Sequence, residues 1–255
     1  MDAAADESRV VKPFGFVGLC LSLIGLAALG LVATALIGVV MAAIAGVVMG
    51  WHGLIDAMHQ ALAHRDEEDV AMRAVFAVIL AFHLGLAIAI LVAAKWRGGS
   101  KWRELIGWQP FRLSDRLIWA IMAGALIYSA AVNGAMDHFL PHPPGQFTIP
   151  ADPAASVAFL ALAVIFAPVT EELLFRGWIY TGLRFHWGLW PALLTTSALF
   201  AFAHYEDTHF YALAVFPVGL ALGAIRERTG SVKASILFHA INNFAAFCLS
   251  ALNGG

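Results

Sequence analysis

Three short groups of polar and aromatic residues interrupt long apolar stretches in the second half of this chain. In chain order they are Glu171-Glu172-x-x-x-Arg176, Phe200-x-x-x-His204 and His239-x-x-x-Asn243. An ionisable side chain at the centre of a bilayer costs about 2.5–3.5 kcal/mol on insertion scales. A chain that keeps several such groups at membrane depth is expected to use them for chemistry or for transport.

The side chains in these groups are the types needed to add water to a carbonyl carbon. A carboxylate next to an imidazole can remove a proton from water as a general base. A second imidazole and a carboxamide carry N–H donors that can stabilise a developing oxyanion. No Ser or Cys stands out beside a base, so a covalent nucleophile is not required. The sequence also has no His-Glu-x-x-His pattern, so a conventional zinc site is not indicated.

Helical spacing gives the two glutamates different tasks. Glu172 and Arg176 are four residues apart, so they lie on one helix face and can form an ion pair. This pairing leaves Glu171 free for other work. His239 and Asn243 are also four apart and share a face of their own helix.

The depth of these residues in the membrane predicts that they meet. At a rise of 1.5 Å per residue, Glu171 and His204 each lie about 20 Å from one membrane face. On the same count His239 and Asn243 lie about 9 and 15 Å deep. We therefore expect these four side chains to line one cavity, open to the cytoplasm.

The composition identifies an integral membrane protein. The chain is 61% hydrophobic and 13% charged, with a mean hydropathy of +0.79, whereas soluble domains are about 25% charged. No basic cluster with interleaved aromatic residues occurs, which argues against binding nucleic acid. Cys20 and Cys248 both lie in apolar stretches, so a structural disulfide or a metal–thiolate site is not expected.

The apolar pattern predicts an all-α, polytopic membrane helix bundle with about seven transmembrane helices. The first stretch is too long for one perpendicular crossing, which needs about 20 residues, and indicates a long tilted or projecting helix. It offers Gly25, Gly30, Gly38 and Gly46 for close helix packing. Residues 51–72 have the pattern of an amphipathic helix at the membrane interface. The predicted spans are 14–50, 73–94, 117–136, 154–184, 189–204, 210–225 and 235–252.

Charge asymmetry predicts the orientation. The segment 95–116 contains six Lys or Arg residues, so it is expected in the cytoplasm, together with Arg176, Arg184 and the turn 226–233. The opposite loops, 137–153 and 205–208, contain no Lys or Arg. Seven crossings then place the N-terminus inside and the C-terminus outside.

The three groups, in this order and on three separate spans, resemble the CPBP family. This family comprises the type II CAAX prenyl proteases and their bacterial relatives, also called abortive-infection-like proteins. The resemblance covers about residues 154–250 and includes the segment 225–231. We therefore divide the chain into an N-terminal transmembrane region, 1–150, without a recognisable motif, and a CPBP-like catalytic core, 151–255.

The resemblance implies an intramembrane glutamic endopeptidase. Glu171 would activate water with the help of His204, while His239 and Asn243 would form the oxyanion hole. Glu172 and Arg176 would fix the geometry of the site, and Phe200 would pack it. The expected location is a bacterial cytoplasmic membrane, with several crossings and a cytoplasmic N-terminus.

The expected substrate is a membrane-associated protein or peptide, lipidated or ending in a CAAX-like sequence. No cofactor is expected. Zinc is the alternative, because two Glu and two His could hold it, but Asn is a poor zinc ligand. The alternative function is a non-catalytic membrane immunity or regulatory protein of the same fold. A proton-coupled transporter is disfavoured, because the polar residues gather in one half of the chain rather than in two repeats.

Other polar residues in or near the spans are predicted to have no catalytic role. His83 is interpreted as a packed or hydrogen-bonded residue. A face of the amphipathic segment that carries His52, Asp56 and His59 is interpreted as wetted by solvent. Asn133 and Asp137 are interpreted as hydrated residues near the outer end of their span.

Overall fold

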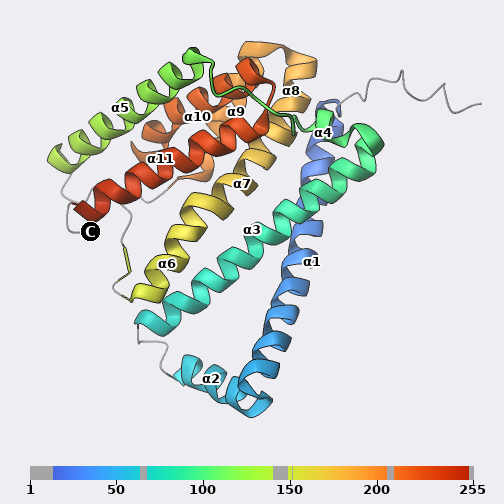
Figure 1. Cartoon of the computed structure of the whole chain (residues 1–255). Helices are drawn as coiled ribbons and strands as arrows, with labels where there is room; N and C mark the ends of the chain where they lie inside the picture. The colour runs from blue at the N-terminus through green and yellow to red at the C-terminus, as the bar shows by residue number, and fades with distance from the viewer. Residues whose placement is uncertain (1–13, 64–67, 140–148, 151, 206–209, 253–255) are drawn as a thin grey trace, which may run out of the picture.

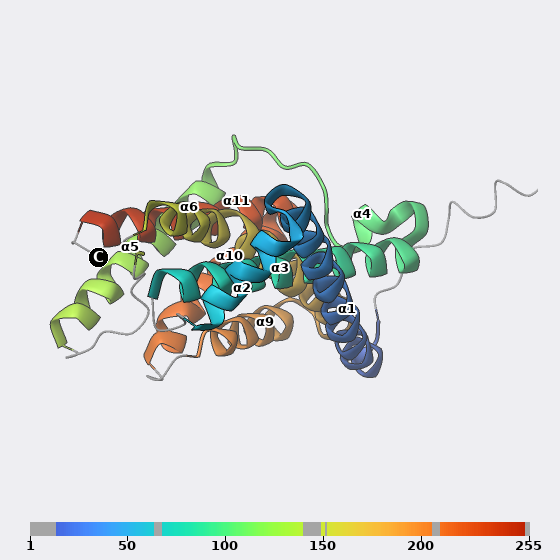
Figure 2. The same cartoon turned by 90° about the horizontal axis from the view of Figure 1, so that it is seen from below.

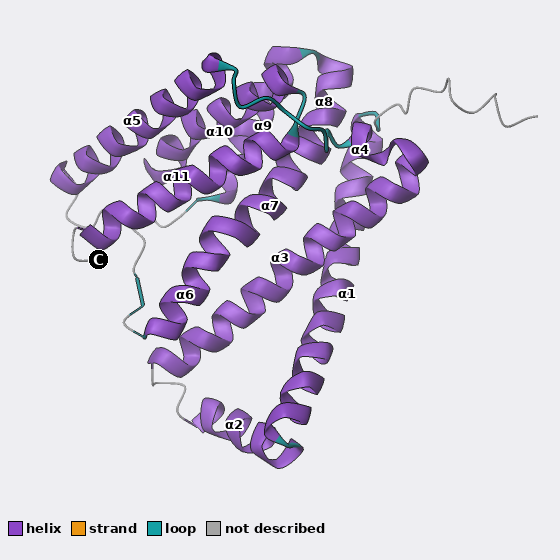
Figure 3. Ribbon diagram, viewed as in Figure 1, coloured by secondary structure: helices purple, strands orange, loops and turns teal. Residues whose placement is uncertain are grey.

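The computed structural model describes residues 14–63, 68–139, 149–150, 152–205 and 210–252. Within these ranges the chain is helical and contains no strand, so the all-α prediction is confirmed (Figure 3). The α-helices are α1 (Phe16–Met49), α2 (Trp51–Ala63), α3 (Glu68–Gly98), α4 (Trp102–Leu105), α5 (Arg116–Phe139), α6 (Pro153–Ala161), α7 (Ala167–Glu172), α8 (Tyr180–Trp187), α9 (Leu189–Ala203), α10 (Phe210–Thr229) and α11 (Val232–Leu252). The other helical segments are η1 (Gly99–Lys101), η2 (Leu162–Phe166) and η3 (Leu173–Ile179).

The first long apolar stretch forms a single helix, α1, and α3 returns beside it (Figure 1). The amphipathic segment is shorter than predicted: α2 ends at Ala63, and α3 already begins at Glu68 rather than at 73. The apolar pattern marks only the part of a helix that meets lipid, so it misses a charged first turn outside the apolar layer. His52, Asp56 and His59 of α2 are exposed, as the solvated-face interpretation requires.

Close approach of backbones packs α1 against α3. A Cβ added to Gly85 of α3 would lie 2.7 Å from the Thr34 nitrogen and 2.9 Å from the Gly30 carbonyl oxygen of α1. Only a residue without a side chain fits there, as is common between membrane helices. Gly25 and Gly38, which the sequence also offered for packing, have nothing within 4 Å of such a Cβ. Figure 2 shows α1 at the edge of the bundle, on the side away from α5.

The span that carries the two glutamates is one helical rod interrupted by two π-helical stretches, η2 and η3. Pro168 lies in the first turn of the rod's middle part, α7, and has no N–H to donate to the preceding turn. The neighbouring Ala167 N–H bonds instead to the Leu162 carbonyl, five residues back. Such π-stretches are frequent at functional sites, and these two flank the glutamates on either side.

Five helical segments are long and apolar enough to cross a membrane, counting the described residues only. They are Phe16–Met49, Val75–Leu105, Arg116–Met136, Pro153–Trp187 and Val232–Leu252. Helix α9 is apolar but shorter. The membrane-bundle prediction is confirmed, whereas the count of seven crossings stays a prediction.

The basic segments that were predicted to share a compartment lie at one end of the bundle, except Arg176, which is fully buried beside Glu172. We call this the basic end; it comprises residues 95–116, Arg184 and the turn 226–233. There the Val232 N–H donates to the Gly107 carbonyl at 2.8 Å, and Arg228 pairs with Asp115 at 2.9 Å. Figure 1 shows this end at the top, where α3 and α8 finish and α5 and α11 start.

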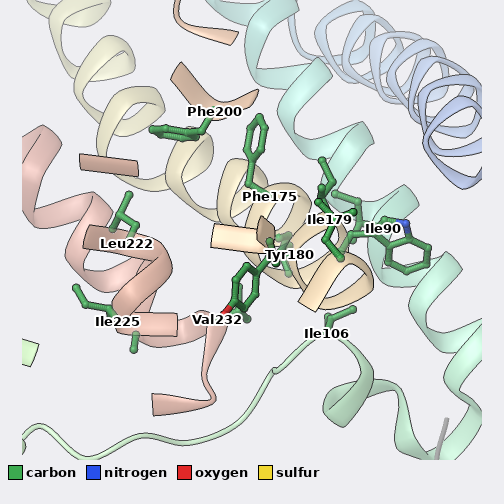
Figure 4. Close-up of a cluster of buried hydrophobic side chains, with 14 of the residues drawn as sticks. Ile90, Ile106, Phe175, Ile179, Tyr180, Phe200, Leu222, Ile225 and Val232 are labelled. Carbon is green, nitrogen blue, oxygen red and sulfur yellow. The ribbon is translucent and has the colours of Figure 1, made fainter. Parts of the chain in front are cut away.

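A layer of buried apolar side chains fills the bundle between the basic end and the polar groups. Ile106 and Val232 lie next to the basic end, and Phe175 and Phe200 lie at the other limit of the layer (Figure 4). Ile225 is fully buried between them. This layer separates the polar groups from the basic end.

Candidate functional site

A buried cluster of three charged or ionisable side chains forms the base of the site. The Glu172 Oε1 atom accepts a hydrogen bond from Arg176 Nη1 at 2.7 Å and lies 3.0 Å from His239 Nδ1. Arg176 also donates through Nη2 to the Gly219 carbonyl at 2.9 Å. Glu172 and Arg176 are fully buried, and His239 is 3% exposed. The predicted ion pair is therefore present, and Glu172 holds one imidazole of the site as well.

The ring of Phe200 packs the cluster from one side. The Arg176 guanidinium carbon lies 4.4 Å from the Phe200 ring centroid, a cation–π distance. The His204 and His239 rings lie 4.6 and 5.6 Å from the same centroid. Phe200 is 1% exposed, so it separates these groups from one another and keeps water out of the ion pair.

The Glu171 carboxylate faces two imidazole nitrogens. Its Oε2 atom lies 3.7 Å from His204 Nε2 and 3.9 Å from His239 Nε2. This oxygen is buried and makes no hydrogen bond within the described part of the chain. The two distances are too long for direct hydrogen bonds. Both imidazole nitrogens therefore face the same carboxylate oxygen without bonding to it.

The partners of the other ring nitrogens fix what these atoms can do. His204 Nδ1 lies 2.8 Å from the Phe200 carbonyl, which can only accept, so Nδ1 carries the proton and Nε2 has a free lone pair. His239 Nδ1 faces the Glu172 carboxylate and is a donor for the same reason. In their neutral forms both imidazoles thus present acceptors to Glu171. A molecule held among them must donate protons, as water does.

Asn243 is oriented by the π-helical stretch η2. Its Nδ2 atom donates to the Ala163 carbonyl at 2.8 Å. Ala163 belongs to η2, where the normal backbone pattern is broken by the start of α7. The second N–H of the Asn243 amide stays available to another acceptor.

His204, His239 and Asn243 line a common cavity of about 90 Å³. Ser129 on α5 and Val218 on α10 also line it. Ser129 lies 13 residues after the start of α5 and Val218 lies 11 residues before the end of α10, about 20 and 16 Å along the helix axes from the basic end. These depths are close to those of Glu171 and His204, so the cavity lies at the level of the site. The membrane face to which the cavity opens stays a prediction.

The donor set does not fit a resident zinc ion. Glu172 Oε1 is already bound by Arg176 and His239, which takes it out of the four ligands that the zinc alternative would use. Across the described residues, no group of three or more His, Cys, Asp or Glu side chains is arranged to hold a metal. No step of the chemistry proposed below passes through a metal.

Three partners of the site were missed from the sequence. Two are the backbone carbonyls of Gly219 and Ala163. For Ala163 the sequence gave one signal, Pro168, which is a source of the π-helical break. Nothing in the sequence marked the carbonyl of Gly219. The third is α3: its His83 carbonyl accepts from Thr170 at 3.0 Å, and the His83 ring lies close enough to experience the charge of Glu171. The N-terminal region, which carries no recognisable motif, thus borders the site.

The comparison with known families agrees with the geometry. Residues 153–245 match the family described as type II CAAX prenyl endopeptidase Rce1-like. This part of the chain is similar to the CPBP family of CAAX protease-like membrane proteins. Neither the curated proteins nor the solved structures gave a significant match to the chain.

The match confirms the resemblance derived from the three motifs. All seven predicted site residues fall inside the matched region. With its long apolar helices, the chain is an integral membrane protein with the fold of an intramembrane protease family. Helices α1–α5 lie outside the match, although α3 and α5 border the site and its cavity.

Proposed function

We propose that this chain is an intramembrane endopeptidase in which Glu171 and His204 activate a water molecule. One observation carries the proposal. A buried Glu171 oxygen without a hydrogen bond lies within 4 Å of two imidazole nitrogens, and both imidazoles line a cavity. Glu172 Oε2 is also without a hydrogen bond, but Glu172 Oε1 holds Arg176 and His239, as expected of a carboxylate that serves structure.

The chemistry follows from the acceptor atoms. A water molecule donates one hydrogen to Glu171 Oε2 and the other to His204 Nε2, so its lone pair points at the substrate. As the water oxygen bonds to the scissile carbonyl carbon, Glu171 takes the proton. The carbonyl oxygen then becomes an oxyanion. Collapse of the tetrahedral intermediate breaks the C–N bond, and the proton passes from Glu171 to the leaving nitrogen.

The oxyanion is stabilised by two donors in this proposal. Asn243 supplies its second amide N–H. His239 supplies Nε2–H when its ring is protonated, since Nδ1–H is already bound to Glu172. Preorganised donors of this kind are each worth about 10²–10³ in rate.

The proposed substrate is a membrane-associated protein, either lipidated or ending in a CAAX-like sequence. This part of the proposal rests on the family alone. The second candidate, a non-catalytic membrane protein of the same fold, would have no use for an unpaired carboxylate oxygen between two imidazoles.

Cleavage by the purified full-length chain in detergent micelles tests the function. The probes are internally quenched peptides: a mixed library, a farnesylated peptide with a CAAX-type ending, and its unprenylated form. We expect wild type to cleave at least one of them and Glu171→Gln to lose at least about 100-fold in rate. Glu104→Gln is the matched control, because Glu104 is exposed on α4. No cleavage by wild type, or equal cleavage by Glu171→Gln, would overturn the proposal.

A further inference from the structure

The cavity continues past the proposed catalytic residues to a polar wall. Ser129 and Asn133 on α5 and Asn242 on α11 line the same cavity as His239 and Asn243. The Ser129 Oγ atom lies 3.4 Å from Asn242 Oδ1, which joins the two helices across the wall. None of these three residues belongs to a motif of the family.

Asn133 lines the cavity although it lies inside the apolar segment Arg116–Met136. It is 17 residues after the start of α5 and three residues before the end of that segment, about 5 Å along the helix from the far end. Polar side chains within membrane spans face a cavity or the bundle interior. The sequence alone suggested a hydrated residue near the membrane face, whereas the structure places Asn133 on the cavity that contains the site.

We propose that Ser129, Asn133 and Asn242 bind the main chain of the substrate next to the scissile bond. A peptide in an apolar cavity must satisfy its backbone N–H and C=O groups, and each unsatisfied group costs several kcal/mol. Side-chain amides offer a donor and an acceptor together. The inference rests on the proposed peptidase function and gives that function a binding surface.

The rest of the lining indicates which peptides fit. The described lining contains no Asp, Glu, Lys or Arg, and its apolar part consists mainly of small aliphatic residues: Val132, Ala214, Val215, Val218 and Ala246. A charged substrate side chain would lose its hydration without gaining a partner. The bound segment is therefore uncharged and extended, with its main chain towards the amides.

Steady-state kinetics on the fastest-cleaved library peptide tests the wall. Asn133→Leu removes the amide, so we expect KM to rise about three- to tenfold, one hydrogen bond's worth, with kcat within about twofold. Asn133→Gln keeps an amide and should recover part of the loss. Ile127→Leu is the control on the same helix, because Ile127 is 70% exposed, and it should match wild type.

Thermal stability separates binding from structure. If Asn133 only joined helices, Asn133→Leu would lower the unfolding temperature. If Asn133 binds substrate, the variant should be as stable as wild type or more stable, since Leu is favoured in the apolar segment Arg116–Met136. An unchanged KM for Asn133→Leu, or a fall in its stability, overturns the proposal.

Cysteine protection tests the wall without catalysis, so its failure can be told apart from failure of the peptidase function. In a Glu171→Gln chain with Cys20 and Cys248 changed to Ser, Asn133→Cys should react with a small methanethiosulfonate reagent. The uncharged members of the peptide library should slow that reaction at least about fivefold, while Ile127→Cys reacts equally with and without peptide. Protection supports the wall even if wild type cleaves nothing. Equal labelling of Asn133→Cys with and without peptide overturns it.

Discussion

The helix pair α1–α3 and the half of the bundle from α7 to α11 are built by opposite means. Close backbone packing around Gly30 and Gly85 joins α1 to α3, and α1 exposes much of its apolar surface. The other half buries Glu172, Arg176 and His239 in one hydrogen-bonded cluster. Lipid is as apolar as leucine, so only close packing can hold α1, whereas the cluster is held by specific bonds.

This difference separates stability from chemistry. In the α1–α3 pair, a substitution acts through fit and changes stability alone. Glu172 Oε1 holds Arg176 and His239, whereas the neighbouring Glu171 Oε2 faces two imidazoles without a hydrogen bond. The comparison predicts that adjacent residues on one helix, Glu171 and Glu172, fail in different ways when they are changed.

The largest expected effect is on the buried ion pair. Glu172→Ala leaves the Arg176 charge buried and unpaired, which should cost about 3–5 kcal/mol of stability. The measurement is the unfolding temperature in detergent micelles. The control is Arg184→Ala, which breaks the Arg184–Glu227 pair, whose side chains are 41% and 33% exposed; it should cost about 1 kcal/mol or less. Equal losses in the two variants would remove the distinction between the regions.

Asn243→Ala should come next. It removes one oxyanion donor, so kcat should fall about 10²–10³-fold with KM little changed. The bond to the Ala163 carbonyl is lost too, and that loss should cost only about 1 kcal/mol of stability. A variant that keeps its kcat but unfolds easily would show that Asn243 serves only to join α11 to η2.

Gly85→Ala tests the other side of the comparison. The added methyl group would meet the α1 backbone within 3 Å, so we expect a loss of about 1–3 kcal/mol. Gly25→Ala is the matched control on α1, with open space around its Cβ, and should leave the unfolding temperature unchanged or raise it. A tolerated Gly85→Ala would mean that α1 can move away from α3 at little cost.

The smallest effect belongs to the exposed pair at the basic end. The hydrogen bond from Arg228 is the main cause that lowers the pKa of Asp115 below its usual value. A lowered folded-state pKa adds stability above about pH 4, where the unfolded carboxyl is ionised, and that stability is lost as the pH falls through the folded-state pKa. Asp115→Asn should therefore unfold at a slightly lower temperature than wild type at pH 6, and the difference should vanish near pH 2. A difference that persists at pH 2 would contradict this origin.

Apolar runs and motif spacing predicted most of the bundle. Every predicted span corresponds to a described helix, because length and apolarity decide membrane helices. The pairing of Glu172 with Arg176 followed from a spacing of four residues. The boundary of α3 at Glu68 did not follow, since charged turns outside the lipid leave no apolar signal.

The contacts between distant segments could not be predicted. The hydrogen bond between His239 and Glu172 joins residues 67 apart. Every residue type has a backbone carbonyl, so the sequence does not mark those of Gly219 and Ala163 as partners of the site. The packing of Ile106 and Val232 is also non-local. Both are buried, and the Val232 N–H at the start of α11 donates to the Gly107 carbonyl in the loop after α4.

Orientation in the membrane stays a prediction, and it decides which compartment the basic end faces. Reporter fusions after Gly99 and after Gly255 should report opposite compartments, the first in the cytoplasm. The same compartment for both would contradict seven crossings.

The most direct test of the account is the activity of protein freed of metal. Wild type is stripped with a strong chelator, shown to be metal-free by elemental analysis, and assayed on the fastest-cleaved peptide beside Glu171→Gln. We predict that stripped wild type keeps its rate and that folded Glu171→Gln loses at least about 100-fold. Activity that vanishes on stripping and returns with zinc would contradict water activation by Glu171 and His204.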